Sequence, residues 1–300
     1  MKSPKIGIVI VNLNRKNDTL RCIASVLTSD YDNYEVLIID NNSSDGSVET
    51  IQEIYPEVRI IRNPKNLGFT GGNNIGIQYF LNQGVNYVFL LNNDATIEPK
   101  ALSSLAGAAS SHPQAGFLGA KICALEDPNI ILHAGGFFSD KWETIHRGLG
   151  EIDTGQFNSI DEVDYLLGCA MLVKCKIIKA IGLLDETFFA YHEEIDWCYR
   201  GKQAGYKVLF VPAAKVLHPD FRTRDANSAM VTYYISRNTL QFAKKHRLGN
   251  LIILRIFISY GRTLLSWSIR PRWRHKNLQR NALMHALFDF VRGKLGPYSA

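Results

Sequence analysis

Apolar and polar positions alternate regularly through roughly the first hundred residues. Residues 6–11 (IGIVIV) are apolar and mostly β-branched, as expected for a strand that is covered on both faces. A polar turn follows, and then apolar side chains recur with helical spacing at Leu20, Ile23, Ala24 and Leu27. Three more strand-like runs, with helical stretches between them, cover residues 34–40, 58–63 and 86–94. This alternation predicts an α/β fold with a doubly wound, mainly parallel sheet and flanking helices.

Polar side chains follow three of these runs at the point where each strand is expected to end. They form the clusters Asn12–Asn14, Asp40–Asn42 and Asn92–Asp94. Ligands of doubly wound sheets bind outside the carboxyl ends of the strands, so we expect these clusters to contact a ligand. Asp40 is a strong candidate because it occupies the last strand position, whereas Asp45–Ser47 is interpreted as a turn and helix cap.

The pattern changes in the rest of the chain. From about residue 115 to 220 the alternation is less regular and richer in glycine and aromatic residues, which suits a second half that covers the edge of the sheet. Beyond residue 227 the pattern is helical. We therefore expect one domain over residues 1–240, built from two halves that meet near residue 115, and a helical tail over residues 241–300.

Composition limits the classes of protein that this chain can represent. With 300 residues, of which 46% are hydrophobic and 21% charged, it can bury a sizeable core, and this excludes a disordered, collagen-like or disulfide-stapled protein. The five cysteines form no CxxC pair, which favours reduced thiols in a cytoplasmic protein. The N-terminus runs directly into a strand and shows no signal-peptide core.

The tail differs from the rest of the chain in charge. Residues 241–300 carry twelve Lys and Arg and one acid, Asp289, so they contribute +11 to a total of +6 and leave −5 on residues 1–240. Residues 251–270 are apolar except for a helical face with Arg255, Arg262 and Arg270. A membrane span would place Arg255 and Arg262 near its middle at a high free-energy cost, so we favour a helix lying in the plane of an anionic membrane.

Two alternatives exist for this tail. It could pack on the rest of the protein or across a homodimer, because an amphipathic helix also fits a protein surface. Nucleic acid is disfavoured as its partner, since the charges accompany bulky aliphatic residues and no motif that reads nucleic acid.

Several acidic residues stand in settings that suggest chemistry. Asp94 follows an apolar strand and could hold a divalent cation that neutralises a diphosphate. His218 would join it only if the fold brings the two together; otherwise it is a structural histidine. Glu193, Glu194 and Asp196 lie within four residues of one another. Such crowding raises a carboxyl pKa toward the range of a general base, although a solvated helix start would look the same.

A glycine-rich segment, NLGFTGGNN, lies between two of the predicted strands. Gly72 would permit close backbone approach to a ligand, and the amide groups near Asn73 at a helix start would suit an anionic phosphate. The segment matches neither GxGxxG nor a Walker loop, and a simple turn is an equally good interpretation.

Taken in order, these segments resemble glycosyltransferase family 2, and in particular its bacterial rhamnosyltransferases of cell-surface polysaccharide synthesis. The resemblance spans residues 5 to about 240. The matching signatures are IVIVNLN, IIDNNSSDGS, NLGFTGGNN, LLNNDATIEP, GCAMLVKCKIIKAIGLLDETFFAYHEEIDWCYR, AGYKV and YYISRN. The family implies a GT-A fold, a nucleotide-diphosphate sugar donor, a divalent metal (Mg²⁺ or Mn²⁺) and inversion at the anomeric carbon. Residues 1–115 would then bind the donor and residues 116–240 the acceptor.

The resemblance also implies roles for individual residues. Asp94 and His218 would hold the metal. Glu194 would be the base, with Glu193 or Asp196 as alternatives. The donor-binding residues would be Asn12, Asn14, Asp40, Asn42, Gly72, Asn73, Asn93 and Asp94, and the acceptor-side residues Gly168, Asp196 and Trp197. Two positions depart from the family pattern, because Asn92 replaces the first aspartate of the DxD element and Glu194 replaces the usual aspartate base.

The family resemblance leads to a specific functional expectation. The chain would transfer one or a few sugars, with dTDP-rhamnose as the first choice of donor and a UDP-hexose as the second, to a glycan or lipid-linked glycan. A sugar-nucleotide-forming nucleotidyltransferase is disfavoured, because NLNRKND after the first strand lacks the glycine-rich loop of that class. The protein would lie in the cytoplasm, peripheral to the inner face of the membrane.

Overall fold

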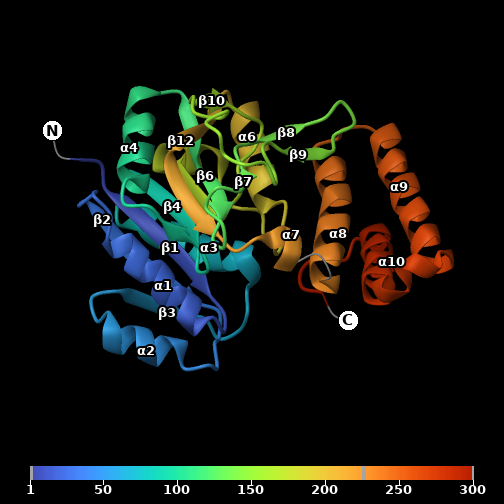
Figure 1. Cartoon of the computed structure of the whole chain (residues 1–300), viewed down its shortest axis with the longest axis horizontal. Coiled ribbons are helices and arrows are strands. Elements are labelled where there is room, and N and C mark those ends of the chain that lie inside the picture. Colours follow the sequence, from blue (N-terminus) through green and yellow to red (C-terminus); the bar gives the residue numbers. More distant parts are fainter. Residues whose placement is uncertain (1–2, 225–227, 299–300) are drawn as a thin grey trace.

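The computed structural model describes residues 3–224 and 228–298. Its first half holds four parallel strands in the order β3-β2-β1-β4, namely β1 (Ile6–Asn12), β2 (Tyr34–Asp40), β3 (Arg59–Arg62) and β4 (Tyr87–Asn92). Helices α1 (Lys16–Leu27), α2 (Ser47–Ile54) and α3 (Gly68–Asn82) connect them. The predicted doubly wound, mainly parallel core is confirmed (Figure 1).

The second half extends the same sheet. The order continues from β4 through β11 (Ala170–Lys174), β6 (Ala115–Ala124) and β12 (Lys207–His218) to β10 (Asp161–Glu162). β11 runs antiparallel between β4 and β6, whereas β12 is parallel to β6. The short strands β5 (Thr96–Ile97) and β7 (Ile131–His133) pair with β12 and β6, and β8 (Gly136–Phe138) and β9 (Thr144–His146) form a separate hairpin.

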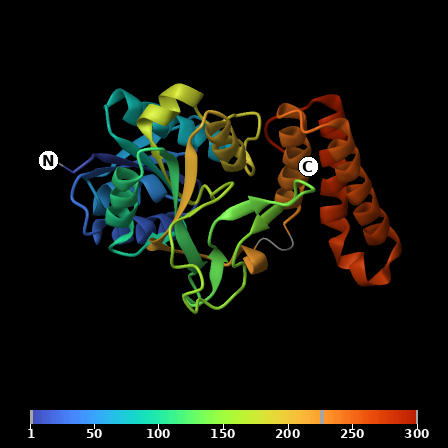
Figure 2. The same cartoon turned by 90° about the horizontal axis from the view of Figure 1, so that it is seen from above.

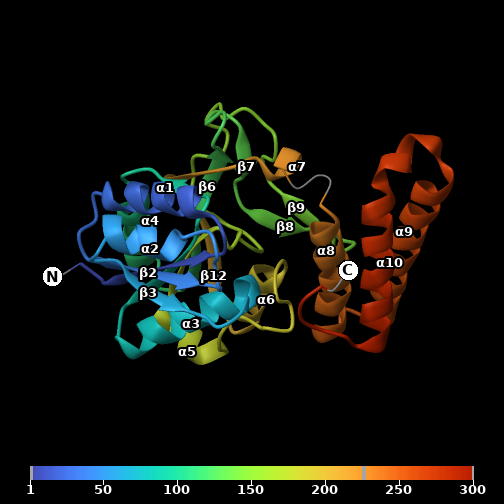
Figure 3. The same ribbon diagram turned by 90° about the horizontal axis from the view of Figure 1, so that it is seen from below.

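Helices cover both faces of the sheet. Figure 3 shows α1, α2 and α4 (Ala101–Ser111) on one side, and α3, α5 (Cys175–Ile181) and α6 (Glu193–Gln203) on the other. The side chains of β1 alternate accordingly, since Ile8 and Ile10 join the core on the α1 side and Val9 joins the core on the α3 side. This two-sided burial explains why β1 is apolar at successive positions.

The structure differs from the sequence pattern at two places. The buried face of α1 is formed by Thr19, Cys22, Ile23 and Val26, while Leu27 is 42% exposed. The glycine-rich segment, for which a simple turn was one of two interpretations, forms the first half of α3. A Cβ atom at Gly72 would lie 2.9 Å from a methyl group of Val11, so this glycine allows the helix to approach β1.

Helices make up the C-terminal part, as expected. They are α7 (Phe221–Arg224), α8 (Ala229–Lys245), α9 (Asn250–Ile269), a 3-10 helix η1 (Pro271–Lys276) and α10 (Asn277–Arg292). Tyr233 of α8 packs with Ala282 and Ala286 of α10, and its hydroxyl donates to Asp289 at 2.7 Å. α9 lies at the outside of this group and buries none of its residues (Figures 1 and 3).

Candidate active site

Three of the predicted residues meet at the carboxyl ends of β1, β2 and β4. The amide of Asn12 donates to Asp40 Oδ1 at 3.0 Å, and Asn12 Oδ1 accepts from Asn93 Nδ2 at 3.2 Å. Asp40 Oδ2 also accepts from the backbone N–H of Ser43. Asp40 and Asn12 are buried, so this network fixes the Asp40 carboxylate in one orientation at the strand end.

Asn14 and Asn42 lie in the loops that follow the same strand ends. Both are exposed and adopt left-handed backbone conformations, with φ values of 52° and 70°. Asparagine tolerates this region better than most residues. Asn14 Oδ1 accepts from the N–H of Ser44 at 2.8 Å and so links the two loops. The structure thus brings both residues to the predicted edge.

Gly72 and Asn73 are placed differently from the prediction. Both are buried within α3, and the Asn73 amide donates to the carbonyl of Phe69 in its own helix. A Cβ atom at Gly72 would lie 2.9 Å from Val11 and 3.2 Å from the amide nitrogen of Asn41, so this glycine allows α3 to pack closely against the strand ends.

Asp94 and His218 are brought together although 124 positions separate them in the sequence. His218 Nε2 lies 3.2 Å from Asp94 Oδ1 and 3.3 Å from the amide nitrogen of Asn92. His218 Nδ1 lies 2.7 Å from the carbonyl oxygen of Pro219. Because a carbonyl can only accept, Nδ1 is the donor in this contact, and a ring that is protonated at Nδ1 alone presents the Nε2 lone pair toward Asp94.

This arrangement fits a divalent cation. Two electron-rich atoms, Nε2 and Oδ1, face each other at 3.2 Å, and a proton or a cation between them would relieve their repulsion. The backbone carbonyl that holds Nδ1 is the kind of partner that orients metal-binding histidines. No group of three or more His, Cys, Asp or Glu suited to a metal occurs among the described residues, so diphosphate oxygens and water would complete the coordination.

The carboxylate cluster lies at the start of α6, after an unusual loop. Phe189, Tyr191 and His192 all have positive φ values, between 65° and 74°. Non-glycine residues rarely adopt this region, and clusters of them occur where surrounding structure holds the chain in place for function. The loop sets the direction in which Glu193 and Glu194 leave the backbone.

Helix α8 holds this loop in place. The amide of Asn238 lies within hydrogen-bond distance of three of its carbonyl oxygens, those of Phe188 (3.0 Å), Ala190 (2.8 Å) and Tyr191 (2.7 Å). The guanidinium of Arg237 donates to Phe188 O as well, at 3.0 Å. Both side chains are fully buried, so these last two residues of the YYISRN motif support the loop.

Burial changes the protonation of the two glutamates. Desolvation raises the pKa of Glu194 to about 7, an effect that backbone amides at the start of α6 reduce in part. Desolvation and the charge of Glu194 raise the pKa of Glu193 well above its ordinary value. Both effects favour the protonated form of Glu193, whereas the pKa of Glu194 leaves a substantial share of this carboxyl ionised and able to accept a proton at neutral pH.

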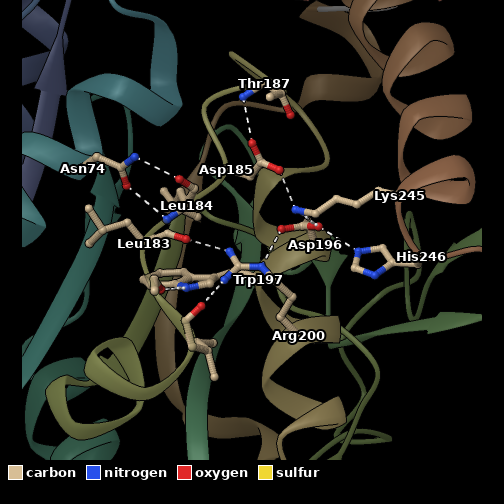
Figure 4. Close-up of polar contacts among 12 residues, drawn as sticks. Asn74, Leu183, Leu184, Asp185, Thr187, Asp196, Trp197, Arg200, Lys245 and His246 are labelled. Atoms are coloured by element: carbon tan, nitrogen blue, oxygen red, sulfur yellow. Dashed lines mark hydrogen bonds and ion pairs between the residues drawn. The ribbon is translucent and has the colours of Figure 1, made fainter.

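Asp196 has a different role. Figure 4 shows its carboxylate among Arg200, Lys245 and His246, at 2.8, 2.7 and 2.8 Å. Although burial opposes ionisation, these hydrogen bonds and positive charges lower the pKa of Asp196 to about 2. A carboxylate this acidic and this fully engaged is a poor proton acceptor, which argues against Asp196 as the base and against a contact with an acceptor.

Trp197 also lies away from any acceptor. Its side chain is completely buried, its indole N–H donates to the carbonyl of Gly182 at 2.9 Å, and its ring packs edge-on against Phe117. The structure therefore places Trp197 in the core behind α6. The sequence motif correctly included α6, but it did not show which residues of this helix face the core and which face the site.

Gly168 connects Glu194 to the Asp94 region. A Cβ atom at Gly168 would lie 3.5 Å from the Cβ of Glu194 and 3.2 Å from the ring of Phe69. The neighbouring carbonyl of Cys169 accepts from the backbone N–H of Asn92 at 2.9 Å. The start of α6 and the end of β4 therefore approach each other across the two residues that precede β11.

Aromatic residues that the sequence analysis did not single out extend from His218. The ring of Phe221 lies 6.4 Å from that of His218 and 6.2 Å from that of His146, measured between centroids. His146 in turn packs edge-on against Tyr165. Burial, and secondarily the charge of Glu194, raise the pKa of Tyr165.

Comparison with known proteins shows which family this chain resembles in sequence. Residues 7–182 match the family model described as Glycosyl transferase family 2. The N-acetylglucosaminyl-diphospho-decaprenol L-rhamnosyltransferase of Mycobacterium tuberculosis is 29% identical over 221 residues, which are 66% of this chain and 70% of that protein. The dTDP-rhamnosyl transferase RfbF of Shigella flexneri is 22% identical over 267 residues, 83% of each chain.

Solved structures show a similar fold. GalNAc-T7 with UDP, GalNAc and Mn²⁺ superposes with a TM-score of 0.61 at 16% identity, and the match covers 82% of this chain and only 55% of that one. The mannosyltransferase PcManGT from Pyrobaculum calidifontis, in complex with GDP-Man and Mn²⁺, gives a TM-score of 0.59 at 11% identity, covering 98% of this chain and 89% of that one.

Proposed function

This chain belongs to glycosyltransferase family 2, and on that basis we propose that it is an inverting enzyme that transfers one sugar from a nucleotide-diphosphate donor to a hydroxyl of a lipid-linked glycan. The first choice of donor is dTDP-rhamnose, because similar proteins are named as rhamnosyltransferases, one of them for the dTDP-sugar. A UDP-hexose is the second choice. The lipid-linked acceptor follows the name of the mycobacterial relative, whose acceptor is attached to diphospho-decaprenol.

The donor binds at the carboxyl ends of the parallel strands. Asp40 contacts the nucleoside, because its carboxylate is already fixed by Asn12 and Ser43 and needs no reorganisation. Asp94 and His218 hold a divalent cation, Mg²⁺ or Mn²⁺, which supplies positive charge against the diphosphate when bound. Mn²⁺ in two solved GT-A structures supports the cation but does not choose between the two ions.

Glu194 is the general base. A hydroxyl is a weak nucleophile, so the acceptor oxygen attacks the anomeric carbon as its proton passes to Glu194, on the side opposite the leaving diphosphate. The observation that supports this role best is the pKa of about 7 of a buried carboxyl, which approaches the Asp94 strand across Gly168. Glu193 is the less suitable base, because burial and the neighbouring charge of Glu194 favour its protonated form.

Donor binding and product identity test this function directly. The protein is incubated with dTDP-rhamnose and a set of UDP- and GDP-sugars, with Mg²⁺ or Mn²⁺, and thermal shift and slow hydrolysis are followed. We expect one donor to stabilise the protein only with metal and to release the nucleoside diphosphate. Release of pyrophosphate, or no stabilisation by any nucleotide sugar, would contradict the proposal.

Replacement of Asp94 by Ala should remove the metal-dependent part of donor binding. The change deletes the anionic ligand beside His218, so calorimetry should show donor affinity in Mn²⁺ falling on the order of a hundredfold, with little change in EDTA. The exposed carboxylate of Asp32 gives a matched control in Asp32→Ala. Equal donor affinity in the Asp94 variant and the parent would remove this residue from the metal site.

We also propose that the tail docks on the anionic inner face of the cell membrane. α9 is long and apolar enough to cross a membrane by length and composition, but it carries Arg255 and Arg262 and is not buried elsewhere in the described structure. An in-plane orientation keeps both arginines hydrated. Co-sedimentation with vesicles that contain phosphatidylglycerol, and much weaker co-sedimentation with pure phosphatidylcholine, is the expected result.

A further inference from the structure

A cavity lies next to the candidate active site, between the β8–β9 hairpin and the C-terminal helices. A cavity of about 980 Å³ is bounded by the β8–β9 hairpin, α8, α9 and η1. Figures 1 and 2 show the tip of the hairpin reaching toward the C-terminal helices. We call this cavity the arginine groove, after the four arginines that line it, Arg255, Arg262, Arg270 and Arg272.

The groove is strongly positive. Lys141 adds a fifth cation to its lining, and Glu143 is the single carboxylate there. Within residues 3–224 and 228–298, no ion pair engages any of the four guanidinium groups. Arg255 and Arg262 lie seven residues apart and therefore on one side of α9, and Arg270 directly follows the last residue of this helix. Guanidinium groups bind phosphate oxygens in pairs, and several close together favour a ligand with more than one negative charge.

An apolar strip runs next to this positive face. Leu251, Ile258 and Leu265 of α9 recur at seven-residue steps and are 62%, 50% and 60% exposed. Ile258 lies one helical turn from both Arg255 and Arg262, so the apolar strip and the arginines are neighbours rather than opposite faces. A molecule with an anionic head and a hydrocarbon chain matches these two adjacent strips better than a purely polar ligand does.

The groove extends to His192, next in sequence to the pair Glu193 and Glu194. His192, which directly precedes Glu193, forms part of its lining, as does Thr239 of α8. The Thr239 hydroxyl lies 3.1 Å from His192 Nε2. A ligand whose phosphates rest on α9 can therefore extend its remaining part toward the start of α6, where Glu194 stands.

From these observations we propose that the arginine groove binds the diphosphate of the lipid-linked acceptor, with the lipid chain along the apolar strip of α9. The inference rests on the proposed transferase function and adds the site that recognises its acceptor. Bilayer phospholipids present single phosphates in a flat layer, whereas this cavity is bounded by the hairpin and is lined by His192, the residue before Glu193. Its shape and charge therefore favour a single diphosphate-bearing molecule.

Tryptophan fluorescence can report on the groove. Trp142, Trp267 and Trp273 line it, and Trp197, the fourth tryptophan of the chain, is buried in the core. Farnesyl diphosphate is the probe, with farnesol and inorganic pyrophosphate as comparisons. We expect saturable quenching by farnesyl diphosphate, and weaker binding of both comparison compounds because each carries only one of the two required parts.

The key variant is Arg255→Gln/Arg262→Gln. It should bind farnesyl diphosphate about a hundredfold more weakly, about tenfold for each arginine. The matched control, Arg274→Gln/Arg280→Gln, removes the same charge from positions outside the groove and should keep the parent affinity. Arg255→Lys/Arg262→Lys keeps the charge but not the paired geometry, and should lie between the two. Unchanged melting temperatures verify that all three fold.

Parallel measurements separate the possible outcomes. Equal losses in the Gln variant and its control would show attraction by net charge and would overturn the proposal. If the Arg255→Gln/Arg262→Gln variant lost binding to phosphatidylglycerol vesicles but still bound farnesyl diphosphate, the groove would be a membrane-binding surface, and this result would also overturn the proposal. Selective farnesyl diphosphate binding in a protein that binds no nucleotide sugar would support the groove and overturn the transferase function.

Discussion

Replacement of Glu194 by Gln is expected to lower turnover about a thousandfold while donor binding stays within a few-fold of the parent. The amide has nearly the same shape but cannot accept the proton of the acceptor hydroxyl, and general base catalysis typically contributes a factor of this size. The variant should also be at least as stable as the parent at pH 8, because it removes a buried charge whose desolvation raises the pKa. Transfer assays and donor calorimetry on the same preparation measure both effects.

The pH dependence of the parent provides a second readout of Glu194. Only the ionised carboxylate accepts a proton, so with a pKa of about 7 the rate should fall about tenfold per unit below pH 7 and level off above it. Glu193→Gln is the control, since burial and the charge of Glu194 favour the uncharged form of Glu193, which glutamine resembles, and this variant should lose much less activity. Near-parent turnover by Glu194→Gln, with a large loss in Glu193→Gln, would reverse the assignment.

Replacement of Asp196 by Asn should be the most destabilising single change near the site, at about 3–5 kcal/mol. The aspartate is fully buried, and its removal leaves the charges of Arg200 and Lys245 without their shared carboxylate. Chemical denaturation at pH 7 measures the loss. The exposed pair of Glu49 with Arg62 provides the control, because Glu49→Gln should cost less than about 1 kcal/mol.

The pH dependence of the free energy of unfolding provides a second test of Asp196. The folded-state pKa of Asp196 is lowered to about 2, so its stabilising contribution is fully present above the unfolded-state value near 4 and is lost as the pH falls toward 2. The Asn variant should lose less stability than the parent over this interval. Parallel curves for the two proteins would show that Asp196 is not the buried hub that its ion pairs indicate.

The sequence predicted the sheet better than the faces of its helices. Periodicity identified β1, β2 and β4 because strands buried on both sides are apolar at every position, and such runs are hard to mistake. The face of α1 was misjudged, since Leu27 has the right spacing but lies at the helix end where no neighbour covers it. For the glycines of α3 the sequence left close approach to a ligand and a simple turn as equal alternatives, and it did not indicate that close packing against β1 also requires glycine.

The candidate site was predictable where its residues belong to short segments at strand ends. Asp40 and Asn12 share a ladder position, and the family resemblance supplied the pairing of Asp94 with His218. The distinction between Glu194 and Asp196 was out of reach, because it depends on Lys245 and His246 about fifty residues later. His146 and Tyr165 have no motif around them, and only the fold brings their rings together.

The contacts of Asn238 and Arg237 with the loop before α6 have a consequence for where this enzyme can be divided. A protein shortened before Ala229 would keep every strand, yet it would leave the carbonyl groups of Phe188, Ala190 and Tyr191 without their amide donor. The smallest active fragment therefore has to include α8. α8 leads to the outermost helices, yet it holds in place the loop before Glu193 and Glu194 and cannot be removed together with them.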